Sequence, residues 1–147
     1  MSAGESMRLK PGGARLGVAA VIGLVLGLSA GAAETPQGRT LSGPEIGAAL
    51  VGNTLSGKSP TGEGWIMWIA PDGKMIVRGT TQNGSMFGDI GTGTVKGDRW
   101  CVTWELLRQG QPMCLTVVKD GDQYRNYAPD GHLESSYTIR PGNPEGF

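Results

Sequence analysis

The side chains that could build a catalytic or metal site are few. The chain has one histidine, His132, and two cysteines, Cys101 and Cys114. A Ser-His-Asp triad would have to use His132, which directly follows the turn 129–131, where a polar, solvent-facing residue is expected in any case. A zinc site needs three or four nitrogen, sulfur or carboxylate ligands, and one histidine beside two cysteines expected to be bonded does not supply them. We therefore predict no catalytic residues and no metal.

The acidic side chains lie mostly in turns. Asp120 and Asp122 resemble the start of a calcium loop, but the rest of its acidic ladder and its distant glutamate are missing. Asp72, Asp98 and Asp130 also stand in turns, where an aspartate caps its own backbone. We expect that the protein uses no cofactor and is not an enzyme. A carboxylate pair of the kind that hydrolyses glycosides stays open as an alternative.

The two cysteines lie in two segments of alternating apolar residues, 99–105 and 112–119. If Cys101 lies opposite Cys114 in an antiparallel pair, large side chains also meet on the opposite face: Trp100 with Leu115 and Val102 with Met113. One register thus accounts for both sets of residues. It predicts a disulfide, formed in an oxidising compartment, across two neighbouring strands.

The chain carries signals for one short helix near the start of its folded part. Ser42 suits an N-cap, Pro44 suits the first turn, and Glu45 completes a capping box. Gly52 marks the end. A helix of this length cannot stand alone in water and has to pack on the rest of the domain.

From Asn53 onward, short apolar segments alternate with turns rich in Gly, Pro, Asp and Asn. Strands are expected at 53–57, 65–70, 74–80, 85–95, 99–105, 112–119, 123–128 and 132–139. The fold class is therefore mainly β, an antiparallel meander forming a small barrel or sandwich of about eight strands, with one short N-terminal helix. Segment 65–70 is apolar throughout, which predicts cover on both faces, with the helix on one of them. Glycines 88, 91 and 93 suggest bulges or sharp curvature.

The first residues form a targeting segment. A positive region precedes an uncharged run at 16–28 and small residues at 29–33, so we expect a secretory signal over 1–33. A flexible leader, 34–40, and a single β-rich domain, 41–147, follow. The run is short for a membrane anchor, and no stable membrane insertion is expected after cleavage. Without Glu5, Arg8, Lys10 and Arg15, the 13 basic and 13 acidic side chains become 10 and 12, so nucleic acid is an unsuitable partner.

An ordered series of motifs runs through the folded part: 41–46, 52–57, 70–73, 97–101, 113–115, 120–124 and 142–147. With this series the chain resembles a family of small exported, periplasmic proteins of Gram-negative bacteria, classed as a domain of unknown function. The resemblance implies a periplasmic β-rich domain and supplies no catalytic residues. Residues 91–93, Gly-Thr-Gly, depart from the family's pattern, which has an aromatic residue after the threonine.

Binding is the function that the remaining side chains favour. Four tryptophans either fill the core or line a ligand pocket, and a hollow interior would favour a small apolar ligand. Candidate contact residues are Leu106 and Leu107 at a hairpin tip, Trp68, and Phe87. We predict a monomeric, non-catalytic domain that binds an envelope protein or a small apolar ligand. Alternatives are an inhibitor of an exported hydrolase, acting through the leader or the leucine tip, and a carboxylate-based envelope enzyme.

Overall fold

The computed structural model describes residue 13 and residues 37–147, and the predicted signal and the start of the predicted leader lie outside them. The folded part is built almost entirely from strands. In chain order the elements are β1 (Arg39–Thr40), α1 (Gly43–Leu50), β2 (Asn53–Lys58), β3 (Gly64–Ile69), β4 (Lys74–Thr80), β5 (Met86–Lys96), β6 (Arg99–Trp104), the 3-10 helix η1 (Leu107–Gly110), β7 (Met113–Asp120), β8 (Gln123–Tyr127) and β9 (Leu133–Pro141).

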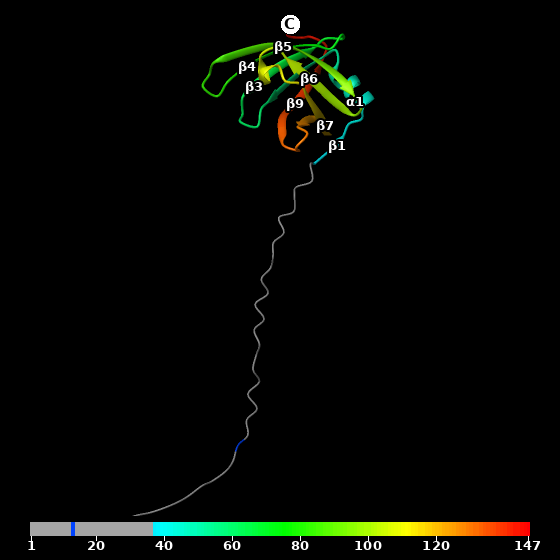
Figure 1. Ribbon diagram of the computed structural model, residues 1–147, viewed down its shortest axis with the longest axis vertical. Coiled ribbons are helices and arrows are strands. Elements are labelled where there is room, and N and C mark those ends of the chain that lie inside the picture. The colour runs from blue at the N-terminus through cyan, green and yellow to red at the C-terminus, as the bar shows by residue number, and fades with distance from the viewer. Residues whose placement is uncertain (1–12, 14–36) are drawn as a thin grey trace, which may run out of the picture. The chain divides into compact units, whose positions relative to one another are not determined.

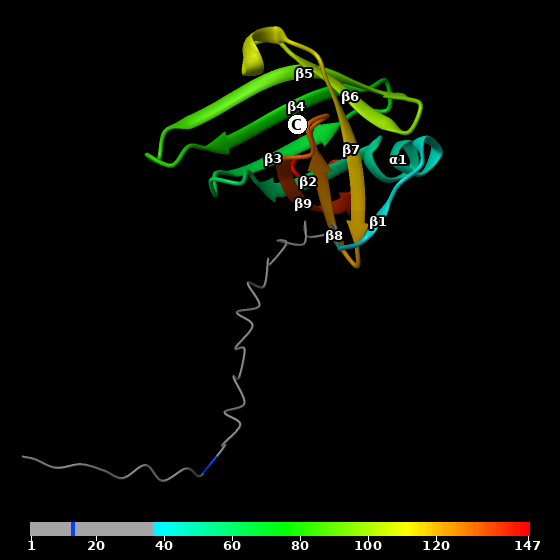
Figure 2. The ribbon, with the colours of Figure 1, turned by 60° about the horizontal axis from the view of Figure 1, so that its bottom comes forward.

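Strands β2 to β9 form a closed antiparallel barrel (Figures 1 and 2). Each strand pairs with the next along the chain, and β2 pairs with β9 to close the cylinder. Closure leaves no long free edge in these eight strands. The predicted fold class, a meander of about eight strands with one short helix, is confirmed, and of its two forms the barrel is the one observed.

The extra strand β1 corrects the predicted boundary of the leader. Arg39 and Thr40 were expected in the flexible leader, yet they pair with Lys119 and Val118 of β7. Strand β6 covers the same edge of β7 only as far as Leu115, so β1 continues the ladder beyond it. The backbone is therefore ordered from a point inside the predicted leader.

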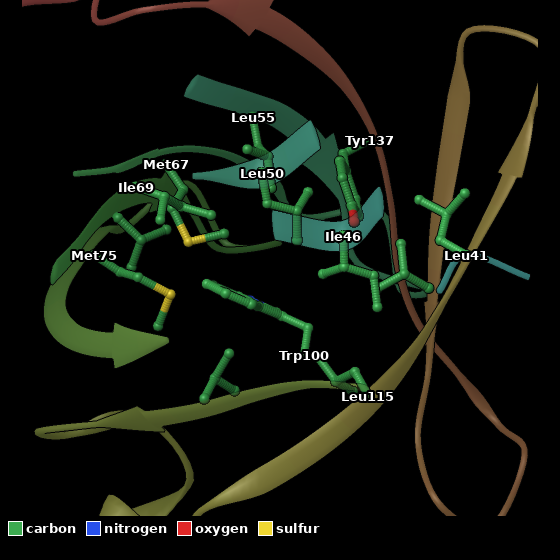
Figure 3. Close-up of a cluster of buried hydrophobic side chains, with 13 residues drawn as sticks. Leu41, Ile46, Leu50, Leu55, Met67, Ile69, Met75, Trp100, Leu115 and Tyr137 are labelled. Atoms are coloured by element: carbon green, nitrogen blue, oxygen red, sulfur yellow. The ribbon is translucent and has the colours of Figure 1, made fainter. Parts of the chain in front are cut away.

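Helix α1 closes one end of the barrel. The predicted capping box is present. The Ser42 N–H and hydroxyl both donate to Glu45 Oε2, at 2.8 and 3.0 Å. The Gly43 N–H donates to Asp98 Oδ1 at 2.7 Å, which ties the helix start to the β5–β6 turn. Ile46 and Leu50 are fully buried in the cluster that fills this half of the interior (Figure 3).

The predicted cover of segment 65–70 by the helix is wrong. Its inward residues do face the core, but the outer face of β3 lies under the C-terminal tail. Glu145 pairs with Arg140 of β9 at 2.5 Å and with Arg78 of β4 at 3.5 Å. Because β2 and β3 lie between β9 and β4, the tail crosses their outer face, where Ile66 and Trp68 point away from the core.

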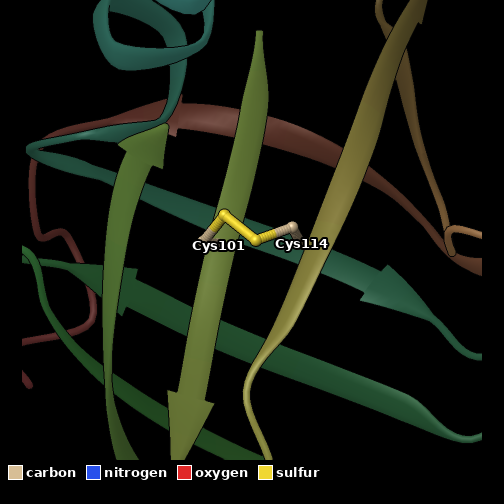
Figure 4. Close-up of a disulfide and its surroundings, with 2 residues drawn as sticks. All are labelled: Cys101 and Cys114. Atoms are coloured by element: carbon tan, nitrogen blue, oxygen red, sulfur yellow. A yellow bond between two sulfur atoms is a disulfide. The ribbon is translucent and has the colours of Figure 1, made fainter. Parts of the chain in front are cut away.

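The disulfide has the predicted register. Cys101 lies opposite Cys114, with a Cα–Cα distance of 3.9 Å, and the flanking partners are those expected from the sequence (Figure 4). Since Trp100 and Val102 point into the barrel, alternation puts the sulfur bridge on the outer face. The bond therefore joins two strands of the wall without entering the interior.

The glycines of β5 do not form the predicted bulges. Pairing of β5 with β4 and with β6 runs without a register shift, and among the described strands the shift lies between Asn126 and Tyr127. The role of the β5 glycines is therefore not to break the ladder. Gly91 and Gly93 face inward, where the rings of Trp104 and Trp100 pack against them.

Candidate functional site

The half of the barrel away from α1 contains an open cavity of about 320 Å³. It lies between the ends of β2, β4, β6 and β8 and the starts of the strands that follow them. The lining is mainly aromatic and aliphatic, with a few polar groups at one side: Ser59, Trp65, Met67, Val77, Phe87, Trp100, Val102, Trp104, Leu107, Arg108, Met113, Leu115, Asn126, Glu134 and Ser135.

Large aromatic rings of the cavity lining pack directly against glycines of neighbouring strands. A Cβ atom on Gly93 would lie 2.6 Å from Cη2 of Trp100 and closer still to Cζ2. A Cβ on Gly91 would lie 2.7 Å from Cε3 of Trp104. Real Cβ atoms do not approach a ring so closely, so these rings rest on bare backbone.

The same arrangement recurs on two further strand pairs. Phe87 lies over its direct cross-strand partner Gly79, with the would-be Cβ 2.5 Å from Cζ, and Trp65 lies over its partner Gly57, with 2.8 Å to Cζ2. Glycine–aromatic pairing of this kind protects a strand that lacks side chains. It also lets each ring occupy the space that a side chain at the glycine position would otherwise fill.

Trp100, which lines the cavity, also belongs to a packed core cluster that contains two tyrosines. Trp100 is 1% exposed, and Tyr137 stacks on Tyr124 with 5.7 Å between ring centres. The Tyr137 hydroxyl donates to Asn126 Oδ1 at 2.9 Å. Burial, and then the neighbouring Tyr124, raise the pKa of Tyr137, so its hydroxyl stays protonated and remains a donor.

A buried carboxylate positions the loop at the cavity rim. Asp89 on β5 accepts hydrogen bonds from the N–H groups of Leu106, Leu107 and Ile90, at 3.0, 2.7 and 2.8 Å. Desolvation opposes its ionisation, but the hydrogen bonds from Leu107, Leu106 and Ile90 outweigh it and lower the pKa of Asp89. An ionised Asp89 thus fixes the start of η1 against the barrel wall.

The backbone that follows is in an unfavourable conformation. Arg108 and Gln109 have φ values of 56° and 55°, in the left-handed region that residues with a Cβ avoid at a cost of about 1–2 kcal/mol each. Strain of this kind persists where the surroundings hold it, and it concentrates at ligand clamps. Here it directs the Arg108 side chain to the cavity.

Charged side chains form a chain along one side of the mouth. Arg108 Nη1 lies 3.3 Å from each oxygen of Glu134, and Glu134 Oε1 lies 2.6 Å from His132 Nε2. The other ring nitrogen of His132 contacts Asp130. Hydrogen bonds to Asp130 and then to Glu134 raise the pKa of His132 above its usual 6.5. Both ring nitrogens are thus engaged by carboxylates, and neither faces a serine as in a hydrolytic triad.

The four predicted contact residues have different positions. Phe87 and Leu107 line the cavity. Leu106 is 75% exposed beside it, so the two leucines do not form a single tip. Trp68 points to the outer face and has no part in the cavity.

Sequence reasoning missed the two charged cavity residues, Arg108 and Glu134, because they meet only when the β6–β7 loop reaches the start of β9. A sequence signal for the packing of rings on glycines was present. Glycines 91 and 93 alternate on the strand that precedes the one carrying Trp100 and Trp104.

Neither the described side chains nor comparisons with known proteins add an identity. In the part of the chain that the structure describes, no three His, Cys, Asp or Glu side chains come together as metal ligands. No helix among those residues has the length and apolar character that a membrane crossing requires. Searches against family models, curated proteins and solved structures found no match for this chain. The resemblance to exported proteins of unknown function therefore stays a prediction.

Proposed function

We propose that this protein binds a small, mainly apolar ligand inside the barrel, without catalysing a reaction. The observation that carries this proposal is the open, mainly apolar cavity, in whose wall aromatic rings pack directly on glycines. Barrels of eight strands are just wide enough to fill with side chains or to hold one small ligand. In this chain the glycines make room for the second outcome.

The size and chemistry of the cavity agree with such a ligand. Its volume of about 320 Å³ lies at the lower end of the roughly 300–1,000 Å³ typical of ligand pockets. Its lining combines a largely apolar wall with a few polar groups on one side, as is usual for sites that orient a ligand. We also propose that the protein acts in the periplasm, which the Cys101–Cys114 bond supports because disulfides persist in oxidising compartments.

A titration with a neutral apolar dye tests the proposal. The emission of N-phenyl-naphthylamine rises when the dye enters an apolar site, and we expect saturable binding to the folded protein. Ser135→Phe should weaken this binding because Ser135 lines the cavity. Its neighbour Ser136 points outward, so Ser136→Phe is the matched control and should leave the affinity unchanged.

Two results would contradict this function. One is a folded wild-type protein that shows no saturable dye signal up to the solubility limit of the dye. The other is an equal loss of affinity in both phenylalanine variants, which would locate the dye on the outer surface. Far-UV circular dichroism of each variant establishes that the barrel is intact.

An inhibitor of an exported hydrolase is a weaker second candidate. Leu106 is 75% exposed and available to a partner, whereas Leu107 lines the cavity and is 36% exposed. The predicted second contact, the leader, is partly held in β1. A hydrolase that co-purifies with the exported protein, and is released by Leu106→Ser, would favour this candidate.

A further inference from the structure

The polar side of the cavity contains one cation. Among the lining residues, Arg108 is the single basic side chain and Glu134 the single acidic one. All other polar lining groups are neutral hydroxyls and an amide. A ligand whose apolar part occupies the cavity therefore meets a guanidinium group where it leaves the apolar wall.

Arg108 is already occupied by a carboxylate, but weakly. Its Nη1 lies 3.3 Å from both Oε atoms of Glu134, which is longer than the roughly 2.7–2.9 Å of a strong charge-assisted hydrogen bond. Glu134 has a closer partner in His132 Nε2, at 2.6 Å. Glu134 can thus release Arg108 and keep a charged neighbour.

The main chain fixes the backbone of Arg108 through contacts that do not involve Glu134. Asp89 fixes the two residues before it through the N–H groups of Leu106 and Leu107. The left-handed conformations of Arg108 and Gln109 then turn the side chain towards the mouth. A side chain carried by a fixed backbone at the rim costs less to order on binding than one carried by a mobile loop.

We propose that the ligand is an amphiphile with a carboxylate head group, which Arg108 binds at the cavity mouth while the apolar part lies among the aromatic rings. This inference rests on the proposed binding function and adds the class of ligand. The guanidinium fork matches a carboxylate geometrically, and Glu134 shows that a carboxylate fits at this distance. The incoming carboxylate takes the place of Glu134.

The test compares three ligands with the same alkyl chain: decanoate, decanol and decylamine. Their affinities are measured by displacement of the neutral dye at pH 7 and low salt. We expect decanoate to bind about fivefold more tightly than decanol, a modest factor because the Arg108 side chain is 43% exposed. Decylamine should bind most weakly.

Variants assign the preference to its side chains. Arg108→Gln should lower the affinity for decanoate to that for decanol measured on the same variant. Glu134→Gln should strengthen decanoate binding, because the competing carboxylate is gone. Arg39→Gln is the control, since Arg39 is a surface cation that pairs with Glu45 at the helix end.

The possible outcomes separate this inference from the binding function beneath it. If decanoate and decanol bind equally, or decylamine binds best, the head-group inference is wrong while the cavity still binds apolar ligands. If the dye binds but none of the three ligands displaces it, the head-group inference is wrong. If the dye itself does not bind, the proposed function fails as well. A decanoate preference that survives Arg108→Gln also overturns the assignment.

Discussion

The indole ring of Trp100 on β6 lies against the bare backbone of Gly93 on β5, so closely that no other residue fits at position 93 without moving the ring. The predicted family resemblance would put an aromatic residue at position 93. Instead, the space above the strand is filled from the neighbouring strand. The ring of Trp100 thus occupies the space that an aromatic side chain at position 93 would need.

Replacing Gly93 with alanine should destabilise the protein by about 1–3 kcal/mol, the usual cost of overpacking a well-packed core. The added methyl group would lie 2.6 Å from Trp100 Cη2, and Trp100 is 1% exposed. The ring would have to move into the cavity, so dye affinity should fall together with the free energy of unfolding. Urea denaturation and dye titration measure the two effects.

Gly88→Ala is the matched control on the same strand. Gly88 faces outward, and the nearest atom to its would-be Cβ is the Val77 carbonyl oxygen at 3.4 Å. We expect a change within about 0.5 kcal/mol and normal dye binding. Equal effects of the two alanines would mean that strand propensity, and not contact with Trp100, explains the glycine.

The disulfide should contribute to stability and not to ligand binding. Cys101 and Cys114 are 13 residues apart, and closing a loop of that size lowers the entropy of the unfolded chain by an amount worth about 3 kcal/mol. The double variant Cys101→Ser, Cys114→Ser should therefore lose about that much free energy of unfolding. Its dye affinity, measured well below the unfolding midpoint, should equal that of the wild type because the bond lies outside the barrel.

Local sequence rules were sufficient for most of the fold. The period-2 alternation around Cys101 and Cys114 determines which residues face inward, and only one register satisfies both the sulfur atoms and the apolar pairs. The start of α1 follows from the side chains of Ser42 and Glu45, which lie three positions apart. These features depend on neighbours in the sequence or on one adjacent strand.

The candidate site depends on contacts that no local rule contains. Arg108 and Glu134 are 26 residues apart and meet because barrel closure brings the β6–β7 loop to the start of β9. Whether the interior is hollow depends on which strand's rings face which strand's glycines. Trp68 lies on the face opposite Met67, and the cover on that face comes from the C-terminal tail, which no local rule predicts.

Asp89→Asn should release the β6–β7 loop from the barrel. The carboxylate accepts three backbone N–H groups, and loss of a charged acceptor at a buried site costs about 1–3 kcal/mol. Hydrogen exchange at the amides of Leu106 and Leu107 should accelerate. Asp72→Asn is the control, because Asp72 accepts one N–H, from Lys74, in an exposed turn.

The pH dependence of the Asp89 effect has a definite sign. Because the folded protein lowers the pKa of Asp89, its carboxylate stabilises the fold above the usual value of 3.8 and loses this effect as the pH falls through the lower folded pKa. The difference in stability between wild type and Asp89→Asn should therefore shrink in acid. A difference that is constant down to the acid transition would contradict the assignment of charge to Asp89.

His132 should titrate above 6.5, because both of its carboxylate neighbours favour the imidazolium form. Proton NMR of its ring measures this pKa directly. Asp130→Asn should lower it most, since the Asp130 contact contributes most to the shift, and Glu134→Gln should lower it less. A pKa at or below 6.5 in the wild type would mean that neither contact persists in solution.

The same titration should regulate the cavity mouth. The pairing of His132 with its carboxylates is present at pH values below 6.5 and is lost as the pH rises through the raised folded pKa. While His132 is charged, it holds Glu134 and leaves Arg108 free for a ligand carboxylate. Once His132 is neutral, Glu134 turns to Arg108 as its remaining cation. Decanoate should therefore bind more tightly below the measured pKa of His132 than above it, while decanol affinity stays constant across the same range, and His132→Ala should remove the difference.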